Sequence, residues 1–227
     1  MNQHDPIIGR YVYINCQGKS YRTYYEEAGE GIPMVCLHTA GTDGRQYRHQ
    51  LCDTDINSNF RIITFDLPWH GKSIPPSGWH LEEDEYKLTT SFYSEFIVEF
   101  CRALELQKPV IMGQSMGGNI CLELALKFEN EFSALIAIEA CDYSPGWHID
   151  PLHHPNIHGG EAVATSVFGL MSPESPDEYR WETWWYYSQG GPGVFKGDLY
   201  YYSVDSDYRD KVHKISEYYD LKNFNFT

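Results

Sequence analysis

The most constraining feature of this sequence is the glycine-rich hexapeptide Gly113-Gln114-Ser115-Met116-Gly117-Gly118. It follows a short apolar run, residues 109–113, that is typical of a buried strand, and it opens an apolar helical pattern over residues 116–128. A G-x-S-x-G sequence between a strand and a helix predicts a tight turn that presents the serine hydroxyl at the end of a sheet. Small residues on both sides of Ser115 leave room for the strand and the helix to pack closely. We therefore expect Ser115 to be an exposed nucleophile.

The chemistry favoured by such a turn is acyl transfer. The N-terminus of the following helix supplies free N–H groups and positive potential for a developing oxyanion. One of the two donors required would be the Met116 N–H, and the other should come from the loop after an earlier central strand. That loop is His38-Thr39-Ala40-Gly41, where we expect Ala40 to be the donor, with Thr39 as the near alternative. We interpret His38 as structural, because it comes too early in the chain to be the base.

A glycine-rich turn before a helix could instead bind phosphate. Here no G-K-[ST] follows the turn, and G-x-G-x-x-G is absent. The sequence therefore does not predict a P-loop or a dinucleotide site.

The chain up to about residue 142 alternates apolar runs with helical patterns. Residues 10–16 and 20–26 predict a hairpin. Further strands are expected at 33–37, 60–66, 109–113 and 134–138, and helices at 46–52, 89–106 and 116–128. Strands that alternate with helices predict an α/β protein with a mostly parallel central sheet and helices on both faces.

The alternation stops at Tyr143, where prolines and tryptophans become frequent. This change divides the chain into a core, an inserted lid or cap, and an atypical C-terminal tail, at residues 1–142, 143–208 and 209–227. In the expected lid, Trp181, Trp184 and Trp185 share one helical face. Packing against the core would explain at least half of the lid aromatics. The others would form an apolar wall over a substrate pocket, and Trp147 and Trp185 are the candidate substrate-binding residues.

Three motifs, in this order, resemble those of the α/β-hydrolase superfamily, in its branch of small cytoplasmic serine esterases, lactonases and carbon–carbon bond hydrolases. They are His38-Thr39-Ala40-Gly41 (usually H-G-x-x), Asp66-Leu67-Pro68-Trp69-His70-Gly71-Lys72-Ser73 (usually D-x-x-G-x-G-x-S) and the hexapeptide around Ser115. Two departures are Thr39, where glycine is usual, and Trp69, which replaces the first glycine of the second motif. The resemblance implies the α/β-hydrolase fold and a serine hydrolase that needs no cofactor. Ser115 argues against the dehalogenase branch, whose nucleophile is aspartate.

The resemblance also implies a triad in the order serine, acid, histidine, with the last two beyond about residue 210. The chain from Ile215 onward contains neither a histidine nor an apolar run that would form a strand. We therefore expect the last two strands of the usual sheet to be missing, as in a C-terminal truncation, and the catalytic acid and histidine stay unassigned. The candidates that the sequence offers are Asp142, Glu139 and Asp220 for the acid, and His148, His153, His154, His158 and His213 for the base.

Two consequences follow from the missing residues. A serine hydroxyl without a base is a poor nucleophile at neutral pH, which argues against full activity. Residues 134–138 would also form an edge strand that is apolar on both faces. Such an edge invites pairing, and a homodimer through it is one expectation.

Three functions are consistent with these observations. The first is hydrolysis of a carboxylic ester or lactone of small size by Ser115. The second is carbon–carbon bond hydrolysis of a vinylogous diketone acid, with Arg45, Arg48 and Arg180 as candidate groups for the acid. The third is an inactive binding protein or truncated product.

Composition excludes several other classes. With 17 basic and 32 acidic residues and a net charge of −15, a nucleic-acid or anionic-membrane surface is not expected. No apolar run is long enough to cross a bilayer, and the N-terminal residues lack a secretory signal. The six cysteines form no C-x-x-C motif, which favours reduced thiols in a cytoplasmic protein. Prolines around His153 and His154 argue against a helical metal site, so we expect no metal.

Overall fold

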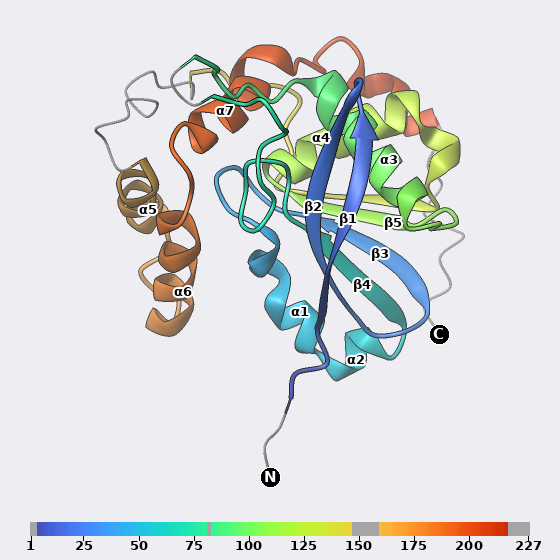
Figure 1. Cartoon of the computed structure of the whole chain (residues 1–227), viewed down its shortest axis with the longest axis horizontal. Helices are drawn as coiled ribbons and strands as arrows, with labels where there is room; N and C mark the ends of the chain where they lie inside the picture. The colour runs from blue at the N-terminus through green and yellow to red at the C-terminus, as the bar shows by residue number, and fades with distance from the viewer. Residues whose placement is uncertain (1–3, 81–82, 147–158, 218–227) are drawn as a thin grey trace.

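Six strands form one central sheet in the computed structural model, which describes residues 4–80, 83–146 and 159–217 (Figure 1). The strand order is β1-β2-β4-β3-β5-β6. The strands are β1 (Ile8–Cys16), β2 (Lys19–Ala28), β3 (Ile32–Leu37), β4 (Phe60–Phe65), β5 (Val110–Gln114) and β6 (Ala134–Ile138). β4, β3, β5 and β6 run parallel, and the β1–β2 hairpin joins β4 antiparallel. The predicted α/β class with a mostly parallel sheet is confirmed.

Helices cover both faces of this sheet. On one face, α3 (Thr90–Ala103) and α4 (Met116–Lys127) bury an aromatic and aliphatic core that includes Phe65, Phe96 and Phe100. On the other face, the short helices η1 (Gly44–Tyr47), α1 (Arg48–Cys52) and α2 (Thr54–Asn57) cover a smaller cluster around Leu51. Figure 1 shows these two groups on opposite sides of the strands. Apolar contact on both faces explains why the parallel strands are continuous apolar runs in the sequence.

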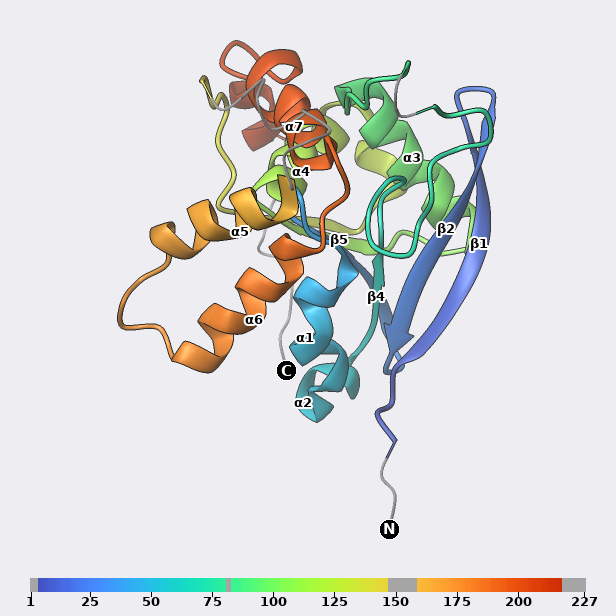
Figure 2. The ribbon, with the colours of Figure 1, turned by 60° about the vertical axis from the view of Figure 1, so that its left-hand side comes forward.

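The segment predicted as a lid contains helices, and no strand among its described residues. α5 (Gly159–Leu170) and α6 (Asp177–Ser188) pack against each other and project from the body of the molecule (Figure 2). α7 (Val194–Tyr200) lies back over the core, followed by a π-helical turn (Tyr201–Asp205) and a 3-10 turn (Val212–Glu217). Trp181 and Trp185 are 57% and 58% exposed, so packing against the core does not explain these two aromatics. No helix in the described ranges is long and apolar enough to span a membrane.

Strand β6 lies at the edge of the described sheet, as expected for residues 134–138. Its side chains Ile136 and Ile138 are 39% and 40% exposed. Pairing of this edge with a second copy of the chain stays a prediction.

The junction of β5 and α4 is the tightest backbone approach around the predicted nucleophile. A Cβ atom at Gly113 would lie 2.0 Å from the Gly117 carbonyl oxygen, and one at Gly117 would lie 2.5 Å from the Leu37 carbonyl oxygen. Gly118 is similarly close to Ile138, at 2.5 Å from its carbonyl oxygen. Backbone atoms cannot move aside as a flexible side chain can. Glycine at these positions is therefore required by the strand–turn–helix geometry.

Replacing Gly113 with alanine should lower the free energy of unfolding by about 3 kcal/mol, because the new methyl group meets backbone. Gly169 is the matched control, since a Cβ there meets nothing within 4 Å inside helix α5. Gly169→Ala should raise stability by about 0.5–1 kcal/mol through its helix propensity. Urea unfolding of both variants measures the contrast, and equal effects would contradict the steric account.

Candidate active site

Ser115 occupies the turn between β5 and α4 in a left-handed backbone conformation, with φ 54° and ψ −114°. Its N–H donates to the Ile138 carbonyl at 2.9 Å, and its carbonyl accepts from the Asn119 N–H at 2.8 Å. These bonds hold a conformation that non-glycine residues rarely adopt. The side chain lines a cavity of about 200 Å³, together with Thr39, Ala40, Val167, Tyr187, Phe195, Leu199 and Tyr202.

Two backbone N–H groups near Ser115 have no acceptor among the described residues. One belongs to Ala40, which lines this cavity, and the other to Met116, the next residue after Ser115. The N–H of Thr39 donates instead to Gln46 Oε1 at 2.9 Å. The N–H of Gly41 donates to Asp198 Oδ2 at 2.7 Å. The structure thus leaves the Ala40 amide available and occupies the Thr39 amide, which was the alternative donor.

Among the described residues, the phenol of Tyr202 faces Ser115. The sequence did not identify this residue as part of the site. Burial raises the pKa of Tyr202, and its contact with the Cys141 thiol acts in the same direction. The Cys141 sulfur lies 3.8 Å from the Tyr202 oxygen, and the Cys141 N–H donates to Asn119 Oδ1 at 2.8 Å. Since the phenol stays protonated at neutral pH, Tyr202 cannot serve as a base for Ser115. Its position depends on a contact between residues far apart in the sequence, so no local pattern could have revealed it.

None of the candidate acids or bases in the described ranges lines the Ser115 cavity. The Glu139 side chain is exposed and accepts from Gln114 Nε2 at 2.7 Å. Asp142 is exposed, and its carbonyl oxygen accepts from the Tyr208 N–H at 2.8 Å. His213 lies in the 3-10 turn near the end of the described chain. The other candidates fall outside the described residues, and these are Trp147, His148, His153, His154, His158 and Asp220.

Trp185, the other predicted substrate contact, lines a different cavity. That cavity of about 520 Å³ lies along α6 and also includes Arg48 and His49. The aromatic residue of α6 that lines the Ser115 cavity is Tyr187, two positions further on. Burial raises the pKa of Tyr187 to about 12, and Thr39 bonds its hydroxyl. The helical pattern identified an aromatic face but not which aromatic side chain turns toward the serine.

A third cavity, of about 340 Å³, adjoins both of the others. It shares Thr39 and Tyr187 with the Ser115 cavity. It shares His49, Tyr179, Glu182 and Tyr186 with the cavity along α6. The three cavities therefore form a series that leads from Ser115 toward the exposed side of α6.

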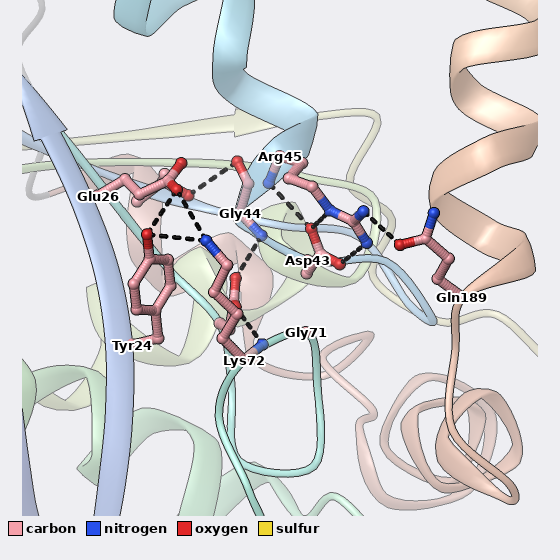
Figure 3. A pocket seen from close by; sticks show the side chains of 10 residues that line it. Tyr24, Glu26, Asp43, Gly44, Arg45, Gly71, Lys72 and Gln189 are labelled. Atoms are coloured by element: carbon pink, nitrogen blue, oxygen red, sulfur yellow. Dashed lines mark hydrogen bonds and ion pairs between the residues drawn. The ribbon is translucent and has the colours of Figure 1, made fainter. Parts of the chain in front are cut away.

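The second motif forms a polar pocket of about 190 Å³ that shares no lining residue with the Ser115 cavity (Figure 3). Asp66 accepts from the N–H groups of Gly44 and Lys72, at 2.9 and 2.7 Å, and so ties the loop after β3 to the loop after β4. Burial, with the nearby Asp43 charge, raises the pKa of Asp66 to about 6. Arg45 forms an ion pair with Asp43 and donates to Gln189 (Figure 3). These pairings indicate a structural role for the motif.

Trp69 shows how the second motif tolerates the loss of its usual glycine. Its φ is 74°, so the position keeps the left-handed conformation that favours glycine. The indole stacks on Tyr86 with ring centroids 4.5 Å apart and meets Trp79 edge-on at 5.3 Å. Packing of this half-buried ring against other aromatic rings offsets a backbone cost of about 1–2 kcal/mol. The turn is therefore retained and filled with an aromatic side chain.

Comparison with known proteins finds the same fold. A family model described as the alpha/beta hydrolase fold matches residues 32–160. The 2-hydroxymuconate semialdehyde hydrolase of Pseudomonas sp. (strain CF600) is 24% identical over 143 residues, which cover 63% of this chain and 47% of that protein. The chain spans less than half of the length of the curated relatives that it matches.

Solved structures of hydrolytic enzymes share the fold. A thermophilic esterase from Thermogutta terrifontis has a TM-score of 0.72 at 19% identity, over 88% of this chain and 75% of that one. The enol-lactonase from Burkholderia xenovorans LB400 has a TM-score of 0.72 at 15% identity, over 86% of this chain and 74% of that one. At these identities the similarity establishes the fold alone.

Gln46 holds the loop that contains the free Ala40 amide. Removing the polar side chain of Gln46 should therefore lower the stability of the fold. Its Oε1 accepts from Thr39 N–H and its Nε2 donates to Gln114 Oε1 at 2.6 Å. Gln46→Leu should lower the free energy of unfolding by about 1–3 kcal/mol, because two partly buried polar groups lose their partners.

Gln50→Leu is the matched control for Gln46→Leu, since the buried Gln50 Oε1 has no partner among the described residues. It should leave the free energy of unfolding unchanged or slightly higher. Thermal or urea unfolding compares the two variants. A Gln46→Leu variant as stable as Gln50→Leu would contradict this assignment.

Proposed function

Because this chain belongs to the α/β-hydrolase fold family, whose members include esterases and lactonases among its structural neighbours, we propose that it is a serine hydrolase of small, uncharged esters or lactones. The nucleophile in this proposal is Ser115. The observation that carries it is a serine in a constrained turn that lines a cavity with Ala40. The Ala40 N–H and the N–H of Met116, the next residue after Ser115, have no acceptor among the described residues. That combination is what acyl transfer requires of a site.

The proposed reaction begins when Ser115 Oγ attacks the carbonyl carbon of the substrate. The carbonyl oxygen becomes an oxyanion, which accepts hydrogen bonds from the N–H groups of Met116 and Ala40. The N-terminus of α4 adds positive potential at the same place. Collapse of this intermediate expels the alcohol, which takes up the proton lost by Ser115, and water then releases the acid and restores the serine.

The proton of Ser115 needs an acceptor, and no histidine or carboxylate lines the cavity within the described ranges. No described residue is therefore assigned the role of base. In the absence of such a group, oxyanion stabilisation and binding alone support only residual hydrolysis. A rate far below that of a complete triad is part of this proposal.

The lining of the cavity supports an uncharged substrate. Its described residues are apolar or hydroxyl-bearing, and none is charged. The three arginines suggested for an acidic substrate are paired elsewhere: Arg45 with Asp43, Arg48 with Glu182 and Arg180 with Asp177. None of the three lines the Ser115 cavity, where a substrate carboxylate would be left without a cationic partner, and this favours an ester over the acid of a carbon–carbon bond hydrolase.

A fluorophosphonate probe tests the nucleophile directly. The wild-type chain should be labelled, slowly compared with an enzyme that has a complete triad, and Ser115→Ala should lose all labelling, because the probe phosphonylates the nucleophilic serine hydroxyl. Ser133→Ala removes an exposed hydroxyl before β6 and is the control that should keep full labelling. Labelling of Ser115→Ala at the wild-type level would overturn the proposal. A folded wild-type chain that is never labelled would support the inactive binding protein instead.

Substrate charge offers a second test. The value of kcat/KM for p-nitrophenyl butyrate should exceed that for the p-nitrophenyl monoester of succinate by about tenfold or more, because the cavity offers no described cation to a carboxylate. A preference for the anionic ester would contradict the assignment of an uncharged substrate.

A further inference from the structure

Asp198, on helix α7, is fully buried, and its carboxylate joins three separate core segments. Its Oδ2 accepts from the Gly41 N–H at 2.7 Å and from His70 Nε2 at 2.9 Å. Its Oδ1 accepts from the Tyr86 hydroxyl at 2.8 Å. The donors come from the loop after β3, the loop after β4 and the segment ahead of α3. One side chain from the predicted lid therefore fixes the relative positions of three core loops.

The loop after β3 is held on both sides of Ala40. Gly41 is bound to Asp198, and a Cβ at Gly41 would lie 2.5 Å from the Phe195 ring, so α7 packs directly on this loop. On the other side, Gln46 accepts the Thr39 N–H. Ala40, between these two anchored residues, carries the amide that lacks an acceptor.

His38 orients that amide together with the Thr42 hydroxyl, which donates to the Thr39 carbonyl oxygen at 3.1 Å. Its Nδ1 lies 2.9 Å from the Thr39 carbonyl oxygen, and its Nε2 lies 3.2 Å from the Leu67 nitrogen. Because Leu67 N–H can only donate, Nε2 is the acceptor and Nδ1–H donates to the Thr39 carbonyl. The Thr39 carbonyl and the Ala40 N–H belong to one planar trans peptide and point in opposite directions. A bond to this carbonyl therefore orients the Ala40 N–H.

His70 supplies the charge that a buried carboxylate needs. Both of its ring nitrogens face oxygen acceptors, Asp198 Oδ2 and the Pro68 carbonyl at 3.0 Å, so both carry hydrogen. Burial lowers the pKa of His70, but the Asp198 charge and hydrogen bond outweigh it and leave the pKa raised. His38, with its ring centroid 4.8 Å from that of His70, has a pKa lowered to about 4 by burial and by the His70 charge, and is neutral.

Building on the proposed function, we propose that Asp198 and His70 are positioning residues that hold the Ala40 N–H in place as an oxyanion donor. The connection runs from Asp198 through Gly41, and from His70 through its packing on His38. Neither residue lines the Ser115 cavity, so both act through the loop rather than on the substrate.

The pairing makes the loop depend on pH in a defined direction. The groups that face His70 are Asp198, His38, Asp66 and the Tyr86 ring. Because the folded-state pKa of His70 is raised, its contribution to stability is complete below the ordinary pKa of histidine and is lost as pH rises through the raised value. At higher pH, His70 no longer contributes a positive charge to its hydrogen bond with Asp198, and the loop is held less firmly.

The rate of Ser115 labelling by the fluorophosphonate probe, measured against pH, tests this role. Asp198→Asn and His70→Gln should each slow labelling about tenfold to a hundredfold, as expected when an oxyanion donor is misplaced. Both should also remove the decline in rate at high pH that the wild type shows. Asp205→Asn is the matched control: the exposed Asp205 carboxylate also joins the lid segment to the core, by accepting the Thr90 N–H at 2.6 Å. It should keep the wild-type rate and pH profile.

A second measurement separates this inference from the proposed function. Amide hydrogen exchange at Ala40 and Gly41 and the NMR titration of the His70 ring need no catalytic activity. In the wild type, the Ala40 amide shift should follow the His70 titration. Asp198→Asn should speed exchange at the Gly41 amide about tenfold or more, because its charged acceptor is replaced by a neutral one. The Ala40 amide, which has no acceptor to lose, is the internal reference. Unchanged exchange at Gly41 in Asp198→Asn, or an Ala40 amide shift that does not follow the His70 titration, would overturn the positioning role. Absence of labelling alone would overturn only the proposed function. If Asp198→Asn does not fold, the wild-type titration still decides.

Discussion

The close approach of backbone at the β5–α4 junction is the constraint on which the rest of the site depends. Gly113, Gly117 and Gly118 let helix α4 start within van der Waals contact of three neighbouring strand ends. The same geometry forces Ser115 into a left-handed conformation and leaves the Met116 N–H at the helix start. Without that approach, the serine would not share a cavity with the loop after β3. The glycines thus determine the position of a side chain that they do not touch.

The fold was predictable because its signals are local. Continuous apolar runs marked the buried parallel strands, the turn residues marked the β1–β2 hairpin, and Thr89 caps α3 as the helical pattern begins. The short helix α2 escaped prediction because its four residues bury no side chain and so leave no apolar periodicity. A strand or helix leaves an apolar pattern in the sequence only where it buries side chains against the sheet.

The surroundings of the serine were less predictable, because they are made by contacts distant in sequence. Tyr202 and Cys141 meet beside Ser115 across 61 positions of chain, and Asp198 meets Gly41 across 157. A single aspartate among many acidic residues gives no sign that it is buried. The aromatic face of α6 was visible, but the choice between Trp185 and Tyr187 depends on how that helix sits over the core. The roles of Ser115, Met116 and Ala40 stay predictions that the geometry accommodates.

The buried Asp198–His70 pair also determines which part of the molecule can move. Lifting α7 from the core would leave a charge without its partner in an apolar interior, at a cost of about 3–5 kcal/mol. A state with α7 detached would then be populated at roughly one part in a thousand. α5 and α6 make no such buried ionic contact with the core among the described residues. In mechanical terms, α7 belongs to the core. α6 is joined to α1 through partly exposed ion pairs of Glu182 with Arg48 and His49, which cost far less to break.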